Sequence, residues 1–297
     1  MSRGDDNDSS LVGWANVNFG EIELGDRIGG GGVGIIYKGW WRNEHVALKT
    51  LFDARIGQDL KQEYMDELLV MSKLEHSNIV KFLGACMTPP NLCFIMELCD
   101  TSLFNLLHME KARFSMQDNL QILIDVGSAM EYLHSLSPAI IHRDLKSLNV
   151  LRAQNGAYKV CDFGLVKVKH TTAGTPAYMA PELMENKPYN KSVDVFAFAV
   201  LMWEVLSGEI PFYQTEVSEI RSKVVAGGRP RIPSYGFTPK LAQLISSGWH
   251  QSPERRPSFP ELVDELLAVE KNLPDTRYTE STKDSVGDAL EGLMAHK

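Results

Sequence analysis

The sequence lacks the long apolar segments that mark membrane and secreted proteins. Its longest apolar run, from Val195 to Trp203, lies between Asp194 and Glu204 and falls well short of the roughly 20 residues that a bilayer-spanning helix needs. The first ten residues are polar and acidic and contain no apolar core of a signal peptide. We therefore expect no membrane insertion and a cytoplasmic location.

Cysteine and positive charge are also scarce. The four cysteines, Cys86, Cys93, Cys99 and Cys161, fit neither a zinc motif nor a CxxC redox pair, so we expect free thiols in a reducing compartment. The 30 Lys and Arg residues are outnumbered by 38 Asp and Glu residues, which gives a formal net charge of -8. No positive field would attract nucleic acid, and none is expected as a partner.

The hydrophobic pattern divides the chain into a strand-rich part and a helical part. Short apolar or alternating runs in the first part predict strands over residues 21–28, 35–38, 46–51, 79–83 and 92–98. Helical spacing interrupts them from Leu60 to Met71. Beyond Cys99 the pattern is mostly helical, with a wholly apolar helix that should end at Gly208 and an amphipathic helix over 259–271. This outline predicts an α+β protein with two lobes.

Five glycines, at positions 29–32 and 34, separate the first two predicted strands. Glycines let backbone N–H groups approach a phosphate that side chains would obstruct. The spacing Gly29-x-Gly31-x-x-Gly34 also fits a dinucleotide-binding fingerprint, but that fingerprint requires a helix next, and residues 35–38 predict a strand. A glycine-rich hairpin without any ligand remains the alternative at this point.

A lysine and two glutamates follow the glycines. Lys49 ends the apolar run Val46-Ala47-Leu48 and would suit neutralisation of phosphate charge, while Glu63 and Glu67 stand one helical turn apart on the next predicted helix, where either carboxylate would pair with it. Each residue alone is better explained as a solvated surface side chain.

Three further motifs change this assessment. They are HRDLKSLN at residues 142–149, DFG at 162–164 and APE at 180–182. In this order, after the glycine loop and Lys49, they resemble the eukaryotic protein kinase family. The resemblance covers residues 20–271 and implies an N-lobe (20–99) with a small antiparallel β-sheet and one helix, and a larger helical C-lobe (100–271). Residues 1–19 and 272–297 are then expected to be flexible tails.

The resemblance also implies roles for the motif residues. Asp144 would be the base that orients the substrate hydroxyl, and Lys146 would face the phosphate during transfer. Asn149 and Asp162 would bind Mg²⁺ as oxygen ligands. Lys49 would hold the phosphates of ATP, and family spacing selects Glu67 over Glu63 as its partner.

An ATP-binding set follows in the same way. Met96 resembles the gatekeeper, and Glu97 and Cys99 would present hinge backbone groups to adenine. The remaining members would enclose the nucleotide from the glycine loop, the ceiling and the floor of the cleft: Ile28, Gly29, Gly31, Gly34, Ile36, Ala47 and Leu151. Asp194, and Arg256 paired with Glu182, match structural positions of the family.

Softer signals point to a branch of the family. Lys146 and the string Gly174-Thr175-Pro176 resemble serine/threonine kinases, and Thr175 would brace the catalytic loop. Strings such as IHRDLKSLNVL and AGTPAYMAPE look most like the tyrosine-kinase-like branch, which includes Raf and mixed-lineage kinases. Thr171 and Thr172 are candidate phosphosites beside Arg143, with plain exposed loop threonines as the alternative. Glu75 stands where Raf-like dimers carry an arginine, so the oligomeric state stays open.

The predicted function is transfer of the ATP γ-phosphate, with Mg²⁺, to Ser or Thr hydroxyls of protein substrates in intracellular signalling. Two alternatives remain, a dual-specificity kinase and a nucleotide-binding scaffold of low activity. The flexible glycine loop is the only support for the scaffold. The substrate, pathway and upstream activator are not specified by the sequence.

Overall fold

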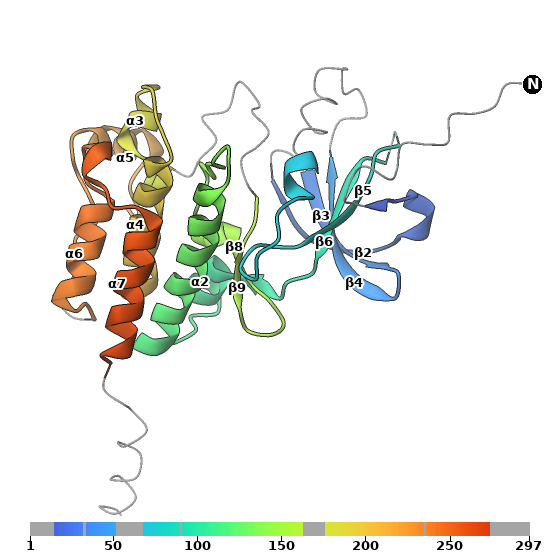
Figure 1. Ribbon diagram of the computed structural model, residues 1–297, viewed down its shortest axis with the longest axis horizontal. Coiled ribbons are helices and arrows are strands. Elements are labelled where there is room, and N and C mark those ends of the chain that lie inside the picture. Colours follow the sequence, from blue (N-terminus) through green and yellow to red (C-terminus); the bar gives the residue numbers. More distant parts are fainter. Residues whose placement is uncertain are drawn as a thin grey trace, which may run out of the picture.

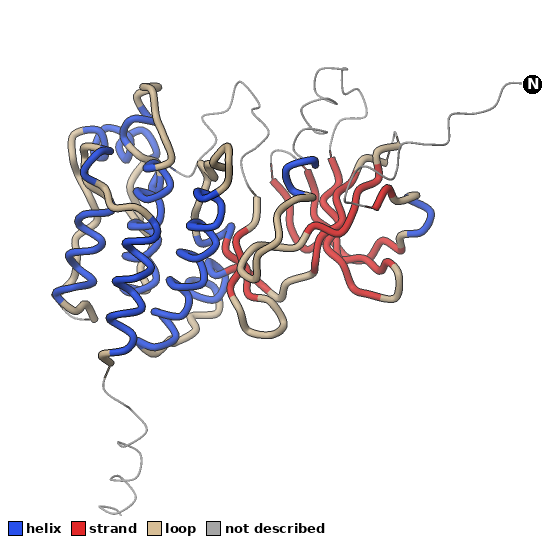
Figure 2. Tube along the Cα trace, viewed as in Figure 1, coloured by secondary structure: helices blue, strands red, loops and turns tan. Residues whose placement is uncertain are grey.

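A computed structural model describes residues 15–31, 34–51, 68–88, 91–162, 176–234 and 236–273 of the chain. These residues form a sheet-rich part and a helical part that lie next to each other (Figure 1). Figure 2 shows the strands gathered in the first part and the long helices in the second. The predicted two-lobed α+β fold is confirmed, and the names N-lobe and C-lobe are used below.

The N-lobe sheet has six strands in the order β1-β5-β6-β4-β3-β2. Their bounds are β1 Ala15–Asn16, β2 Glu23–Gly31, β3 Gly34–Trp41, β4 Glu44–Leu51, β5 Phe82–Cys86 and β6 Cys93–Glu97. Between β3 and β4, Arg42 and Asn43 form a two-residue turn with positive φ at both positions, 49° and 66°. Such turns match the twist of the flanking strands, and this one sets a register in which Lys49 lies opposite Ile36.

The sheet begins earlier in the chain than expected, because the sequence analysis placed residues 1–19 in a flexible tail. Ala15–Asn16 pairs in parallel with β5, and Val17 is only 3% exposed. Val17 belongs to the same hydrophobic cluster as Ile22 and Trp41. A two-residue strand is too short to show alternation, so the sequence pattern gave no sign of it.

The predicted strand over 79–83 is displaced, since β5 runs from Phe82 to Cys86. Ile79 and Val80 are buried against the C-lobe instead. Ile79 forms a parallel bridge with Val160, and the Val80 N–H donates to the Val160 carbonyl at 3.0 Å. An apolar run shows that residues are buried but not against which partner, which explains the shift.

A small sheet and a set of helices build the C-lobe. The sheet has the order β7-β8-β9, with β7 Thr101–Ser102, β8 Val150–Arg152 and β9 Tyr158–Val160. The α-helices are α2 Met116–Ser135, α3 Pro181–Met184, α4 Ser192–Ser207, α5 Val217–Val225, α6 Pro239–Gly248 and α7 Phe259–Lys271. The shorter elements are the π-helix η2 Asn105–Met109 and the 3-10 turns η1 Phe19–Glu21, η3 Ser147–Asn149, η4 Pro176–Tyr178 and η5 Pro253–Arg255.

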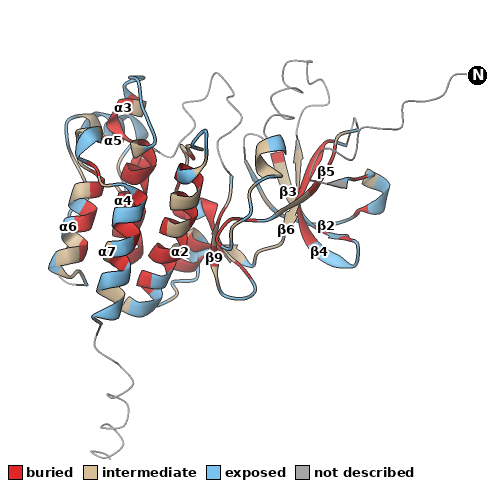
Figure 3. Ribbon diagram, in the orientation of Figure 1, coloured by how far each residue is buried: buried red, intermediate tan, exposed pale blue. Residues whose placement is uncertain are grey.

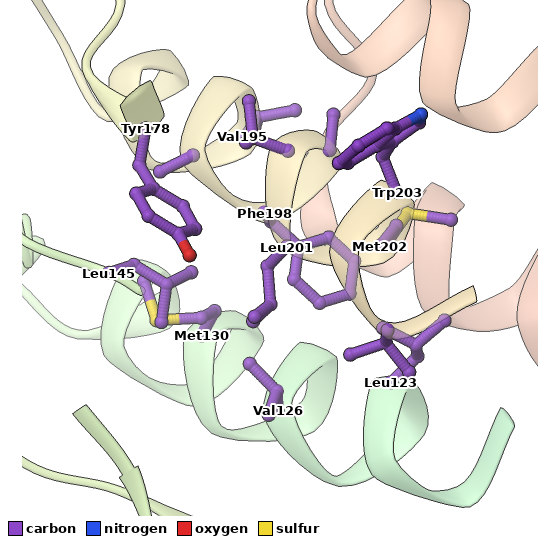
Figure 4. Close-up of a cluster of buried hydrophobic side chains, with 14 of the residues drawn as sticks. Leu123, Val126, Met130, Leu145, Tyr178, Val195, Phe198, Leu201, Met202 and Trp203 are labelled. Atoms are coloured by element: carbon purple, nitrogen blue, oxygen red, sulfur yellow. The ribbon is translucent and has the colours of Figure 1, made fainter. Parts of the chain in front are cut away.

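Helix α4 is the centre of the C-lobe core. All of its residues from Val193 to Leu206 are buried, and Figure 3 shows the buried surfaces of the neighbouring helices turned toward it. Figure 4 shows Phe198 and Leu201 of α4 near Val126 and Met130 of α2, in one hydrophobic cluster. The helix that supports the functional loops is therefore the most deeply buried element of the lobe.

The end of α4 also agrees with the sequence. Gly208 takes the left-handed conformation at φ 69° and caps the helix, a conformation that glycine adopts without steric cost. In the part of the chain that the structure describes, no helix is long and apolar enough to cross a membrane.

Candidate active site

The loop between α2 and β8 brings together two predicted catalytic residues, Asp144 and Lys146, and one predicted metal ligand, Asn149. Lys146 Nζ lies 2.7 Å from Asp144 Oδ2, and Asn149 Nδ2 donates to the same oxygen at 3.1 Å. Asn149 also donates to the Asp144 backbone carbonyl at 2.8 Å, which fixes the loop on both sides of the aspartate. Among the described residues both donors use one carboxylate oxygen, which leaves Oδ1 to accept a hydrogen bond from a substrate hydroxyl.

Asp194 of α4 holds the beginning of this loop. Its Oδ1 accepts from the Arg143 N–H, and its Oδ2 accepts from the His142 N–H and from His134 Nε2, all at 2.8 Å. The side chain is fully buried, and a buried carboxylate is stabilised only when such donors surround it. The structural role expected for Asp194 therefore has a clear geometric basis.

Lys49 and Asp162 form an ion pair between the two lobes. Lys49 Nζ on β4 lies 2.5 Å from Asp162 Oδ1, and the two side chains are 18% and 38% exposed. Asp162 has a positive φ of 56°, so the chain turns sharply directly after β9. Lys49, which is expected to hold phosphate, therefore lies in direct contact with Asp162, which is expected to bind metal.

The predicted metal ligands lie on adjoining segments. The Cys161 N–H donates to the Asn149 carbonyl at 3.0 Å, which places Asp162 next to the end of η3. Within the described ranges, no three His, Cys, Asp or Glu side chains form a group that would hold a metal by themselves. One amide and one carboxylate oxygen still fit Mg²⁺, because this ion is usually bound through one or two protein ligands with phosphate and water oxygens as the rest.

The strands β4 and β6 place the predicted adenine-binding residues. Ala47 lies opposite Met96 in the register of these strands. Leu151 is on β8, opposite Lys159 of β9 and Ser102 of β7. The predicted adenine-binding residues therefore lie on two sheets, the six-stranded sheet of the N-lobe and the three-stranded sheet of the C-lobe. The segment after Glu97 connects these two sheets.

The predicted hinge residues are held by both lobes. The Glu97 carboxylate accepts from Lys159 Nζ at 2.7 and 2.9 Å and from the Lys81 N–H at 2.6 Å. The Glu97 N–H donates to the Lys81 carbonyl, so this N–H is not available to adenine. Burial, with the nearby Glu97 carboxylate, raises the pKa of the Cys99 thiol to about 12. Cys99 would therefore contribute backbone groups and a neutral thiol.

The glycine-rich hairpin is described up to its tip. Gly29 lies opposite Ile36 and Gly31 opposite Gly34, while Ile28 is half exposed on β2. Four other predicted residues, Glu67, Thr171, Thr172 and Thr175, lie outside the described residues.

Sequence reasoning missed a second carboxylate on α4. Glu204 is fully buried and binds His108, Ser147 and Tyr178, whereas in the sequence it only marks the end of an apolar run. One signal was present in the sequence. A charged residue inside a helix that is apolar on every face must have buried polar partners.

Arg256 and Glu182 form the pair that the motifs predicted. The two Nη–Oε distances are 2.6 and 2.9 Å, and both residues are buried. Two parallel hydrogen bonds of this kind are typical of an arginine paired with a carboxylate. It joins the APE motif to the segment before α7 and keeps α3 in place beside the catalytic loop.

Comparisons with known proteins show which family the chain belongs to. Residues 22–266 match the model of the protein tyrosine and serine/threonine kinase family. The chain is 37% identical over 279 residues to the serine/threonine-protein kinase STY46 of Arabidopsis thaliana, covering 91% of this chain and 48% of that protein. It is 35% identical over 285 residues to STY17 of the same plant, covering 93% of this chain and 49% of STY17. The chain thus spans about half the length of these relatives.

The chain therefore belongs to the protein tyrosine and serine/threonine kinase family. The relatives STY46 and STY17 are both named as serine/threonine-protein kinases. The family predicted from the motifs is confirmed. A match to a joint tyrosine and serine/threonine kinase model is also what a tyrosine-kinase-like serine/threonine kinase should give.

Proposed function

We propose that this protein transfers the γ-phosphoryl group of ATP to Ser and Thr hydroxyls of protein substrates, with Asp144 as the catalytic base. The observation that carries the proposal is the Asp144 carboxylate, which Lys146 and Asn149 hold through one oxygen, while the other oxygen has no hydrogen-bond donor among the described residues. Phosphoryl transfer depends mainly on positioning and charge stabilisation. Oδ1 would orient the acceptor hydroxyl in line with the phosphate and accept its proton.

The cations and metal ligands of the site suit the phosphates of ATP. Lys146 would neutralise charge on the transferred phosphoryl group, and Lys49 would hold the other phosphates. Asn149 and Asp162 would hold Mg²⁺, which would supply additional neutralisation of phosphate charge. In the structure Asp162 contacts Lys49 directly, so this contact would loosen when nucleotide binds and supplies new partners for both residues.

The remaining assignments concern the nucleotide pocket and the activation segment. Ile36, Ala47 and Leu151 would enclose adenine, with Met96 at the back of the pocket and with backbone groups of Glu97 and Cys99 at its edge. Glu67 would position Lys49, Thr175 would brace Asp144 and Lys146, and Thr171 and Thr172 would be phosphosites. All four cysteines are free in the structure, which supports our proposal of a cytoplasmic location.

The test is transfer of labelled phosphate from Mg-ATP to a generic protein substrate such as casein. We expect label on Ser and Thr and none on Tyr, as read by phosphoamino-acid analysis. The variant Asp144→Asn should lower the rate by about 100-fold or more, since a positioned general base contributes about 10²–10⁴-fold.

A matched control is Asp264→Asn, which makes the same chemical change on the exposed face of α7. It should transfer phosphate at the rate of the unchanged protein. Equal rates for both variants would contradict the role of Asp144. Label on Tyr as well as on Ser and Thr would show dual specificity, and ATP binding without transfer would show a scaffold.

A further inference from the structure

The catalytic loop exposes one leucine beside the reaction centre. Leu148 is 47% exposed, although its chain neighbours Ser147 and Asn149 are both buried. Leu145, the other leucine of the loop, is only 1% exposed and belongs to the hydrophobic cluster shown in Figure 4. Exposure is therefore a property of Leu148 itself, and the packing of the loop onto the C-lobe does not explain why this residue is apolar.

Leu148 lies within reach of a polypeptide that is bound at Asp144. Asn149, the next residue in the chain, donates to the Asp144 carbonyl at 2.8 Å and to its carboxylate at 3.1 Å. Consecutive Cα atoms are about 3.8 Å apart, and an extended chain advances about 3.3–3.6 Å per residue. A substrate whose hydroxyl lies on Asp144 can therefore place a side chain about two or three residues away from that hydroxyl against Leu148.

Met109 adds a second exposed apolar side chain to this part of the molecule. It is the last residue of η2, directly after His108, and is 63% exposed. His108 Nε2 and Ser147 Oγ both lie 2.8 Å from the same oxygen of Glu204, so the end of η2 is held next to the catalytic loop. Met109 and Leu148 each follow one of these two donors in the chain. We refer to these two exposed residues together as the apolar rim.

The apolar rim suits an uncharged substrate side chain. Neither of its residues carries a charge. Glu204, the carboxylate between the two elements, is fully buried and accepts hydrogen bonds at both oxygens, so it has no free side for a basic group of the substrate. A charged side chain placed against Leu148 would lose hydration without gaining a partner, whereas an apolar one would gain buried area.

We propose that Leu148, together with Met109, is a specificity-determining residue that selects protein substrates with a large apolar side chain two or three residues from the phosphorylated Ser or Thr. The contact is made to the substrate side chain and to no reacting atom. It raises kcat/KM for the matching substrate and leaves the KM for ATP unaffected. The inference rests on the transfer to Ser and Thr hydroxyls proposed above.

The test uses serine peptides in which Leu, Arg or Glu is placed in turn at each of the four positions before and after the acceptor. With the unchanged full chain, Leu two or three residues from the acceptor should give a kcat/KM about tenfold above that of the matching Arg or Glu peptide, a usual discrimination for an apolar contact. Leu148→Glu should reverse the preference at that position in favour of Arg, because it replaces the apolar contact by a counter-charge. Leu148→Ala should weaken the preference without reversing it.

Leu267→Glu is the matched control, since it makes the same change at a leucine of similar exposure, 43%, on α7. It should keep the peptide preference of the unchanged protein. Met109→Glu tests the second residue of the apolar rim from a different element, and it remains informative if Leu148→Glu does not fold. We expect it to favour the Arg peptide over the Leu peptide as well. The KM for ATP should be equal in all of these proteins.

Three outcomes would overturn the inference. They are the absence of any preference for Leu near the acceptor, a Leu148→Glu profile equal to that of the unchanged protein, and equal changes in Leu148→Glu and Leu267→Glu. A loss of activity on all peptides with a matching rise in the KM for ATP would also count against it, because it would show a structural effect. Failure of the unchanged protein to phosphorylate any peptide or protein would instead contradict the proposed function, and this result is obtained before any variant is compared.

Discussion

Lys49 and Asp162 approach each other closely although both side chains are partly exposed. Ion pairs with this exposure contribute little to the free energy of unfolding, about 0–1 kcal/mol. The same holds for Lys146 and Asp144, at 17% and 25% exposure. Stability therefore does not account for these two lysine–aspartate pairs, and substitutions there should change the chemistry more than the fold.

The first residue-scale prediction concerns Lys49→Met. Methionine keeps the length of the side chain and removes its charge, so kcat/KM for ATP should fall by about 100-fold, the order expected for loss of one electrostatic stabiliser. Steady-state kinetics with varied ATP would measure this. Thermal unfolding should show little change.

Lys38→Met is the matched control, because Lys38 is an exposed lysine on the neighbouring strand β3, opposite Ala47. It should leave both the kinetics and the midpoint unchanged. If the two lysine variants lost activity equally, Lys49 would have no special role toward the phosphates.

At the scale of elements, the periodicity of the sequence predicts those helix bounds that depend only on residues within the helix itself. The helix from Ser192 to Ser207 and its cap at Gly208 follow from one apolar run and one glycine. The helix over 259–271 was predicted with the bounds that α7 shows. The displaced strand β5 and the early strand β1 depend on a partner elsewhere in the chain, and no local pattern contains that partner.

The same holds for the site, where local motifs identify some residues and contacts between distant segments determine the others. The motifs identified Asp144, Lys146 and Asn149, and the structure places them together. The sequence did not indicate that Glu204 would bind Ser147, because the two residues lie 57 positions apart and only the packing of α4 against the catalytic loop brings them into contact. His108, which belongs to no motif, was missed for this reason too.

Helix α7 offers an element-scale prediction on pH. Glu261 accepts from the Ser258 N–H and hydroxyl, both at 2.7 Å, and these hydrogen bonds lower the pKa of Glu261 from its ordinary value of 4.5. A carboxyl with a depressed pKa in the folded state contributes stability above its unfolded pKa, and that contribution disappears as the pH falls through the folded pKa. Glu261→Gln should therefore lower the midpoint at pH 7 and have a smaller effect below pH 4.5.

Thermal unfolding of the unchanged protein and of the Glu261→Gln variant, from neutral pH to about pH 3, measures this difference. This pH range includes the ordinary pKa of a carboxyl group. Ser258→Ala removes the other half of the cap and should cost about 1 kcal/mol at neutral pH. Glu270→Gln, in the last turn of α7, is the control for the loss of one carboxylate. A Glu261→Gln effect that is constant with pH would contradict the capping explanation.

At the scale of the whole molecule, the lobes are joined by more than the connecting segment. Residues 78–80 lie along β9, where Val160 donates to the Asn78 carbonyl at 2.8 Å and bridges Ile79. Glu97 adds an ion pair with Lys159 of the same strand. Because β9 leads directly into Asp162, these contacts fix this proposed metal ligand relative to β6, the strand that ends at Glu97.

Asn78 is the polar side chain that secures this junction. It is 8% exposed, and its Nδ2 donates to the Tyr158 carbonyl of β9 at 3.0 Å. Asn78→Ala would leave that buried carbonyl without this donor, at a cost of about 1–3 kcal/mol. We expect a lower calorimetric midpoint and a broader transition, as the lobes begin to unfold separately, together with reduced kcat. Asn91→Ala, in an exposed turn where Asn91 uses only its backbone N–H, should retain the sharp transition. If both alanine variants unfold like the unchanged protein, the junction at Asn78 does not couple the lobes, and the segment after Glu97 must do so alone.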